Sequence, residues 1–339
     1  MTAPRPLHIL VVFTGGTIAS HNSGGTFEMS DAPYRLFSGV PADRCKIEAF
    51  EPLKTLSENM TPDMLFDLFA AISEEFARKI YDGMIIAHGT DTLAYTAQMA
   101  DILLSGLGIP VVVLGSKLPL DNPKSDGQAN FNNALALIQQ EKSGVYVASR
   151  ARDGKDYIHF ASKVMQADSQ TDDFQSYMEQ YAGIMQDGVF VHNNNSHPYS
   201  TAHSSRELLS RLISSGKNPV EETVLVLDAC VGMNYQTLDL TRPEYDFIIQ
   251  RLYHSGTSCT VTRTSPYSLL YLQDLCTENF KRLFIAPIEK TRTPYSTTRE
   301  LLEAGITPVF DRPLEAVWAG LLVCTWLKEK PEEFFNFSD

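Results

Sequence analysis

Short apolar runs alternate with amphipathic stretches along most of this chain, and that alternation predicts strands joined by helices. Leu7–Phe13 is a continuous apolar run, which is typical of a central strand covered on both faces. Thr61 and Pro62 have the chemistry of a helix N-cap and first turn, and apolar residues at helical spacing follow them. Further strands are expected at Met84–Ala87, Val111–Leu114 and Val145–Ala148, helices at Leu93–Leu104 and Ala129–Gln140, and part of a hairpin at Gly188–His192. The order predicts a parallel sheet flanked by helices.

The segment from Asn193 to Asn218 is rich in Asn, Ser, Gly and Pro, a composition typical of turns and linkers, with a short helix expected at Arg206–Ile213. The alternation then resumes with apolar segments at Val224–Leu227, Tyr245–Tyr253 and Leu283–Ala286, a strand near Cys259–Val261, and helices at Leu269–Leu275, Thr297–Ala304 and Leu314–Leu327. We therefore predict two α/β domains. The larger N-terminal domain covers residues 1–193, a linker covers 194–218, and a smaller C-terminal domain covers 219–339.

The composition is that of an ordinary globular protein, with 43% hydrophobic and 20% charged residues. The formal net charge of −13 argues against nucleic acid or an anionic membrane as the main partner. The 5 cysteines are scattered and form no C-x-x-C pair, so reduced thiols and a cytoplasmic location are expected. The apolar run at the N-terminus is too short for a signal peptide, and no apolar stretch reaches the roughly 18 residues of a membrane span.

Two short segments rich in Gly and Thr directly follow predicted strands. One is Thr14-Gly15-Gly16-Thr17-Ile18-Ala19, and the other is His88-Gly89-Thr90-Asp91-Thr92. Ligands of α/β sheets bind at the carboxyl ends of strands, where glycines let backbone N–H groups approach closely. Each segment alone is ordinary turn and cap chemistry, and neither has the spacing of a phosphate-binding loop. Together they predict a concave spot that holds the hydroxyls of Thr14 and Thr90 and the carboxylate of Asp91.

With these segments the chain resembles the bacterial-type L-asparaginases of the asparaginase/glutaminase family, in particular the cytoplasmic type I branch. The resemblance is carried by the two Gly/Thr segments, the stretch Asp82–Leu104, Pro110–Gly115, Ser125-Asp126-Gly127 with Asn130, Lys163-Val164, Asp173-Phe174 and Gly256-Thr257. It implies a two-domain asparaginase-like fold. The larger N-terminal domain would hold a mostly parallel sheet flanked by helices, and the smaller C-terminal domain would be a flavodoxin-like α/β domain.

The resemblance also implies which residues carry the reaction. Thr14 is expected to be the nucleophile that attacks a side-chain amide and forms an acyl-enzyme. Thr90, Asp91 and Lys163 would form the relay that activates it, since an alcohol is a weak nucleophile at neutral pH. An ordinary lysine has a pKa of about 10.4, and a nearby carboxylate favours its charged form. Lys163 is therefore either a desolvated base or an ammonium ion that orients Thr90, and the sequence leaves both open.

Substrate capture is implied in the same way. Asp91 would hold the α-amino group of the substrate and Ser57 its α-carboxylate, while the backbone around Gly15 and Gly89 would stabilise developing negative charge. Ser116, which follows a predicted strand, is a further pocket candidate.

Two positions depart from the family pattern. Glu58 stands where many relatives have Gln or Ser, and an acid there can shift the preference among asparagine, glutamine and related amides. The family's mobile loop usually carries a tyrosine that bonds to the nucleophile, whereas here Thr26 and Phe27 fall near that position.

The leading prediction is thus an L-asparaginase that produces L-aspartate and ammonia without a metal or cofactor, as a homodimer or homotetramer. One alternative is the amidase subunit of a tRNA-dependent amidotransferase, which shares the fold. Those subunits usually carry an extra N-terminal module, whereas here the first strand begins at Leu7, and the net charge disfavours tRNA. The other alternative is a non-catalytic sensor of asparagine or aspartate, which the missing loop tyrosine keeps open.

Overall fold

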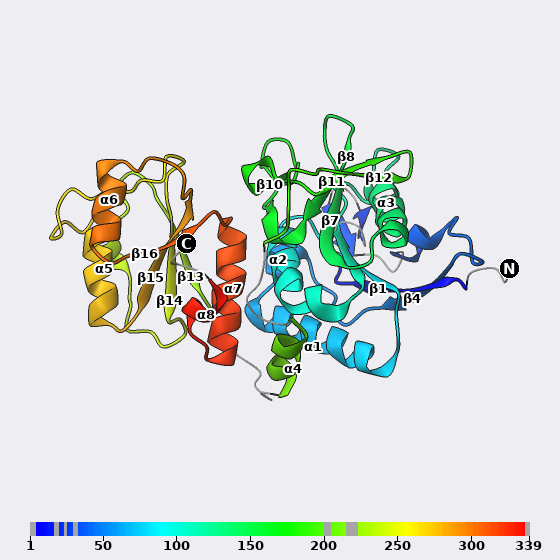
Figure 1. Cartoon of the computed structure of the whole chain (residues 1–339), viewed down its shortest axis with the longest axis horizontal. Helices are drawn as coiled ribbons and strands as arrows, with labels where there is room; N and C mark the ends of the chain where they lie inside the picture. Colours follow the sequence, from blue (N-terminus) through cyan, green and yellow to red (C-terminus); the bar gives the residue numbers. More distant parts are fainter. Residues whose placement is uncertain are drawn as a thin grey trace. The chain divides into compact units, whose positions relative to one another are not determined.

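The computed structural model describes residues 5–16, 20–23, 26–29, 33–199, 205–214 and 223–335. The chain divides into two compact units, Met1–Asn218 and Pro219–Asp339 (Figure 1). Each unit is a sheet with helices packed against it, so the predicted α/β class is confirmed. Within the described ranges, no helix combines the length and the apolar composition that crossing a bilayer requires.

The described part of the first unit contains an eight-stranded sheet in the order β12-β11-β8-β7-β6-β5-β1-β4. Its strands are β1 (Leu7–Phe13), β4 (Cys45–Phe50), β5 (Gly83–Ala87), β6 (Pro110–Leu114), β7 (Gly144–Arg150), β8 (Asp156–Phe160), β11 (Gly183–Gln186) and β12 (Val189–His192). Neighbours from β4 to β7 are parallel, and neighbours from β7 to β12 are antiparallel. The predicted parallel sheet is therefore present, with an antiparallel extension on one side.

The central strands are apolar along their whole length because helices cover both faces of the sheet. On one face, Ile9, Val11 and Ile85 belong to the same core cluster as residues of α3 (Gly127–Gln140). The helices α1 (Pro62–Arg78) and α2 (Leu93–Leu104) pack against each other, and α2 packs against β6 and β7 on the opposite face. Both faces of these strands are thereby removed from water, which holds their carboxyl ends rigid.

The order of the parallel strands locates the place where a ligand is expected. After β1 the chain adds β4 on one side and then β5 on the other side of β1. Leaving aside the separate hairpin β2 (Ser20–Ser23) and β3 (Thr26–Met29), this is the 2-1-3-4-5 order of flavodoxin-like sheets. Ligands of such sheets bind at the switch point, which here lies at the carboxyl ends of β1 and β5.

The second unit contains, in its described part, a four-stranded parallel sheet ordered β13-β14-β15-β16. Its elements are β13 (Leu225–Asp228), β14 (Phe247–Arg251), α5 (Leu269–Glu278), β15 (Arg282–Ile288), α6 (Ser296–Glu303), β16 (Thr307–Phe310), α7 (Leu314–Leu327) and α8 (Pro331–Phe334). The unit is the smaller α/β domain that was expected, and the strands of its parallel sheet follow chain order.

One segment differs from the sequence predictions. Cys259–Val261 was expected to be a strand and is irregular backbone, because the carbonyl of Cys259 accepts from the N–H of Leu269 at the start of α5 instead of joining a ladder. The helix expected at Arg206–Ile213 is present as α4 (Ser205–Ser214), which packs against α1 and α2.

Candidate active site

The predicted site residues follow neighbouring strands of the first sheet. Thr14 comes directly after β1, and Thr90 and Asp91 follow β5. Ser57 begins a short 3-10 helix, η3 (Ser57–Asn59), on the chain that leaves β4. Because these strands are parallel neighbours, their carboxyl ends lie at one edge of the sheet. Lys163 lies on a different element, at the end of a 3-10 helix, η5 (Ala161–Lys163), that follows the antiparallel strand β8 and packs against α2.

Glycines bring the two Gly/Thr loops into direct backbone contact. A Cβ on Gly16, which has φ +76°, would lie 2.4 Å from the Cα of Gly89. A Cβ on Gly89 would in turn lie 2.4 Å from Oγ of Ser57. No side chain fits at either position, and Gly16 also has a left-handed backbone that favours glycine. The loop of Thr14, the loop of Thr90 and the side chain of Ser57 are therefore packed as one block.

Thr14 is held rigidly at the end of β1. It is 1% exposed, its N–H donates to the carbonyl of Ala87 at 3.1 Å, and its carbonyl accepts from the N–H of Thr55 at 3.0 Å. Its Oγ1 also donates to the carbonyl of Ala87, at 3.2 Å. A backbone carbonyl does not take up the proton of an alcohol, so the hydroxyl needs a further group before it can act as a nucleophile.

Ser57 and Asp91 form the polar pair of the site. Ser57 is 3% exposed and its Oγ donates to Oδ2 of Asp91 at 3.3 Å, while its carbonyl accepts from Oγ1 of Thr92 at 2.8 Å. Asp91 itself is exposed, as is the neighbouring Glu58. A hydroxyl anchored beside an accessible carboxylate is an arrangement that can bind the carboxylate and the ammonium group of one amino acid.

Lys163 is almost fully buried, at 4% exposure. Its Nζ donates to Oε1 of Gln180 and lies 4.5 Å from the ring centroid of Tyr199. A weaker link joins the segment after it to the site, since Nε2 of Gln166 donates to the carbonyl of Asp91 at 3.4 Å. Gln180 and Tyr199 were missed by the sequence analysis because neither belongs to a motif, and only the fold brings them to the lysine.

His88 is a third residue that the sequence analysis did not single out. It is fully buried at the end of β5, and burial lowers its pKa to about 4. Its Nδ1 donates to the carbonyl of Gly89 at 2.8 Å, and its Nε2 accepts from Oγ1 of Thr96 at 2.9 Å. This neutral imidazole ties the Gly89 backbone to α2 and thus helps to fix the loop that carries Thr90.

The remaining candidates have other surroundings. Ser116 is fully buried, and its Oγ donates to the carbonyl of Leu118 at 2.5 Å and lies 2.9 Å from Oγ of Ser125, so the hydroxyl is committed to its own loop. Thr26 and Phe27 begin β3, and their side chains lie outside the described part of the structure. The residues Thr17-Ile18-Ala19 of the first Gly/Thr segment also lie outside the described residues.

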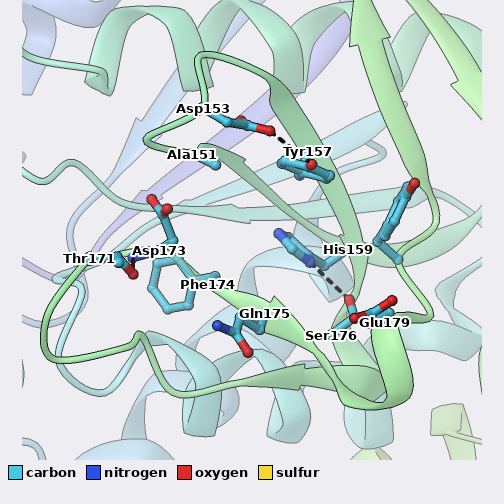
Figure 2. Close-up of a pocket in the computed structure, with 11 residues that line it drawn as sticks. Ala151, Asp153, Tyr157, His159, Thr171, Asp173, Phe174, Gln175, Ser176 and Glu179 are labelled. Carbon is cyan, nitrogen blue, oxygen red and sulfur yellow. Dashed lines mark hydrogen bonds between the residues drawn. The ribbon is translucent and has the colours of Figure 1, made fainter.

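A cavity of about 540 Å³ is formed by residues of the segment 151–181 (Figure 2). Its lining is mostly polar and aromatic: Ala151, Asp153, Tyr157, His159, Thr171, Asp173, Phe174, Gln175, Ser176, Glu179 and Tyr181. His159 and Ser176 are joined at 2.8 Å, and burial lowers the pKa of His159 to about 4. Glu179 and Tyr181 line this cavity, whereas Gln180 between them reaches Lys163.

Comparison with known proteins identifies the family. The family model described as "Asparaginase, N-terminal" matches residues 8–197. L-asparaginase of Thermococcus kodakarensis is 37% identical over 145 residues, which cover 42% of this chain and 44% of that protein. L-asparaginase 1 of Escherichia coli K12 is 26% identical over 331 residues, 92% of this chain and 90% of that protein. A glutamyl-tRNA(Gln) amidotransferase subunit of Haloquadratum walsbyi is 30% identical over 313 residues, 89% of this chain and 68% of that protein.

Solved structures agree with these sequence matches. The thermostable L-asparaginase from Thermococcus kodakarensis superposes with a TM-score of 0.76 and 25% identity, over 98% of this chain and 96% of that one. The probable cytoplasmic L-asparaginase from Campylobacter jejuni gives a TM-score of 0.72 at 22% identity, which supports the fold. The chain therefore belongs to the asparaginase family. Within that class it is an amidohydrolase, and both Gly/Thr loops, Ser57 and Lys163 lie inside the matched residues.

Proposed function

We propose that this enzyme is an L-asparaginase that converts L-asparagine and water into L-aspartate and ammonia without a metal or cofactor. The observation that carries the proposal is the block formed by the loops of Thr14 and Thr90, joined through Gly16 and Gly89 at the switch point of the sheet. The relatives named L-asparaginase support the choice of substrate. A glutaminase side activity is part of the proposal.

In the proposed reaction Oγ1 of Thr14 attacks the carbonyl carbon of the side-chain amide. The C–N bond then breaks, ammonia leaves with the proton that Thr14 gives up, and an ester to Thr14 remains. Water attacks that ester, releases L-aspartate and returns a proton to Oγ1. Thr90, with Asp91 and Lys163, is the group that orients and activates the hydroxyl of Thr14 and the attacking water. The backbone around Gly15 and Gly89 would stabilise the oxyanion.

The substrate would be held by Asp91 through its α-amino group and by Ser57 through its α-carboxylate. The exposed position of Asp91 and its 3.3 Å contact with Ser57 support this assignment, because both groups can reach one small zwitterion. Glu58 is exposed beside Ser57 and is the residue that we expect to influence the choice between asparagine and glutamine. The hydroxyl of Ser116 is bonded within its own loop, so we propose that Ser116 contributes to the substrate pocket only by stabilising that loop.

We also propose that the enzyme works in the cytoplasm as a homodimer or homotetramer, on a free amino acid and with neither nucleic acid nor a membrane as partner. The scattered cysteines, the net charge of −13 and the resemblance to type I asparaginases support this setting. Light scattering coupled to gel filtration tests the oligomeric state, and a monomer at working concentration would contradict it.

A second candidate is an amidase subunit that supplies ammonia for a tRNA-dependent amidotransferase. The 30% identity to the Haloquadratum walsbyi amidotransferase subunit, over 89% of this chain, favours it. The matched region spans 68% of that protein, and the acidic composition of this chain is unfavourable for tRNA. Activity on free asparagine without tRNA distinguishes the two candidates.

The first experiment measures ammonia release from L-asparagine and L-glutamine by the purified protein. We expect kcat/KM to be higher for asparagine, and Thr14→Ala to reduce kcat by at least about 1000-fold, because the nucleophile is lost. Thr14→Ser, which keeps a hydroxyl, is the matched control and should retain part of the activity. Hydroxylamine added during turnover should trap the acyl-enzyme as aspartyl hydroxamate.

Two results would contradict the proposal. Turnover that survives Thr14→Ala unchanged would remove Thr14 as the nucleophile. If calorimetry shows that the protein binds asparagine or aspartate but no ammonia is released, the result would instead support a non-catalytic sensor of these amino acids.

A further inference from the structure

The side chain of Lys163 has neighbours that no motif of the family predicted. Its Nζ donates to the amide oxygen of Gln180 and stands over the ring of Tyr199, 4.5 Å from the centroid. We propose that Gln180 and Tyr199 are positioning residues that hold Lys163 as an ammonium ion, so that in the proposed relay it acts as a charged group and not as a base. The inference rests on the proposed function, because it deepens the role of the lysine in that site.

Both contacts favour the charged form of the lysine. An ammonium ion has donors only, so the amide of Gln180 must present its oxygen, and a donor on a cation makes the stronger hydrogen bond. The face of an aromatic ring carries negative charge density and attracts a cation more than a neutral amine. Burial of Lys163 has the opposite effect and favours the neutral amine, because removal from water disfavours a charge. An amine left neutral would gain little from either neighbour.

The turn that places Gln180 beside Lys163 has a strained backbone. Met178 and Glu179, which precede it, both have φ +56°, in the left-handed region that residues with side chains rarely adopt. The turn is closed by the N–H of Gln180 donating to the carbonyl of Tyr177 at 3.2 Å. Gln180 contacts Lys163, whereas Glu179 and Tyr181 on either side of it line the cavity. Strained backbone that persists in a fold commonly marks a functional position.

Tyr199 is tied to the lysine segment by a separate contact. Its N–H donates to Oγ of Ser162, the residue before Lys163, at 3.2 Å. The ring and the lysine are thus positioned by the same short helix, η5. Two independent contacts therefore position Nζ of Lys163. One is with Gln180 on the strained turn, and the other is with the ring of Tyr199, which is bonded to Ser162.

Other charged and titratable groups lie on the elements packed around η5. Tyr95 and Asp101 lie on α2, and Asp91 lies just before it. On β7 they are Tyr146, whose hydroxyl contacts Glu141, and Arg150, which pairs with Asp156. His159 and Glu179 line the cavity. His159 is neutral near pH 7, because burial lowers its pKa to about 4.

The test measures the pKa of Lys163 directly, in the full-length protein labelled with ¹³C at the lysine ε carbons, and assigns its signal from the spectrum of Lys163→Arg. Relative to the wild type, Gln180→Leu should lower this pKa and Gln180→Glu should raise it, each by about one unit or more. Tyr199→Leu should lower it by about half a unit, whereas Tyr199→Phe, which keeps the ring, should leave it in place. Opposite shifts from two substitutions at one position would not arise from a purely structural role.

The same variants are then compared in the pH profile of kcat/KM for asparagine. If the ammonium ion is the active form, activity falls as pH rises through the pKa of Lys163, and this alkaline limb moves with each variant as its pKa moves. Activity that rises with pH through that same pKa would make Lys163 a base and overturn the proposal. Equal pKa values in Gln180→Leu, Gln180→Glu and wild type would also overturn it.

The two proposals fail in different ways. A wild-type protein that releases no ammonia would contradict the proposed function, while the titration of Lys163 would still decide the role of Gln180 and Tyr199. If Gln180→Leu does not fold, as judged by circular dichroism, Gln180→Asn withdraws the amide oxygen with little change in polarity and is expected to lower the pKa of Lys163.

Discussion

Two hydroxyls of the proposed site are buried, whereas its carboxylate is exposed. Thr14 and Ser57 are 1% and 3% exposed, so each hydroxyl is kept in one geometry by its surroundings. Asp91 is exposed, and its carboxylate therefore remains hydrated until a ligand arrives. A buried carboxylate without a partner would be strongly disfavoured, whereas a hydroxyl that keeps one hydrogen bond can be buried at small cost. This division suits an enzyme that fixes its nucleophile and recognises a charged amino group at the entrance.

A prediction at this scale concerns the charge of Asp91. Asp91→Asn keeps the size of the side chain and removes the charge that would pair with the α-amino group of asparagine. We expect KM for asparagine to rise about 10-fold to 100-fold, as for the loss of a hydrogen bond to a charged group. Steady-state ammonia release measures it.

The control is a substrate and not a second variant. Succinamic acid is asparagine without its α-amino group, so Asp91→Asn can lower its kcat/KM only through the relay, and the loss should be smaller than the loss with asparagine. An equal loss with both compounds would show that Asp91 does not recognise the amino group.

Among the elements, the contact between the loop after β1 and the loop after β5 organises the site. Gly16 and Gly89 touch through their backbones, and the Ser57 side chain closes the other side of Gly89. The hydrophobic pattern predicted β1, β5, β6 and α2, because continuous apolar runs mark buried strands and apolar spacing marks helices. It missed β4 and β8, whose polar residues include Lys46, Glu48 and His159, because strands that are not apolar throughout lack that signal.

The glycine contact gives a prediction at the scale of these loops. Gly16→Ala places a methyl group against the Gly89 backbone, which cannot move aside as a flexible side chain would. We expect the loops to separate and ammonia release to fall by at least about 100-fold, in line with the effect of small displacements on catalysis. Steady-state kinetics and thermal unfolding are measured together.

Gly39→Ala is the matched control. Gly39 also has a left-handed backbone, with φ +86°, but a Cβ there meets nothing within 4 Å. Its substitution should cost about 1 kcal/mol of stability through backbone strain and leave kcat/KM unchanged. Equal losses of activity in both variants would show that strain, and not the contact with Gly89, accounts for the effect.

For the whole molecule, the first sheet carries two buried histidines that link stability to pH. His88 on the loop after β5 and His159 on β8 both have a pKa lowered by burial to about 4, against 6.5 for an exposed imidazole. Between these two values the unfolded chain binds a proton at each histidine and the folded protein does not. Protons therefore favour unfolding there, and the histidines contribute stability that is fully present above pH 6.5 and lost as pH falls towards 4.

We predict that the free energy of unfolding decreases as pH is lowered from about 6.5 to 5, with a slope that approaches two protons. The full loss at pH 4 is on the order of 3 kcal/mol for each histidine. Denaturant titrations at several pH values measure the slope. His159→Gln should reduce it by about one proton, whatever its effect on stability at pH 7. A slope that is the same in the double variant His88→Gln/His159→Gln would contradict this origin.

Local patterns were enough to predict the α/β class, the buried strands, most helices and the candidates Thr14, Thr90 and Asp91, because apolar spacing and short loops of Gly and Thr beside strands are local features. Ser57 and Lys163 became candidates only through the resemblance to the asparaginase family. Three features became known only from the fold: the strand order that places β1 beside β5, the contact of Gly16 with Gly89, and the contacts of Lys163 with Gln180 and Tyr199. Strand order and long-range contacts depend on how the whole chain packs, and no local pattern of residues specifies them.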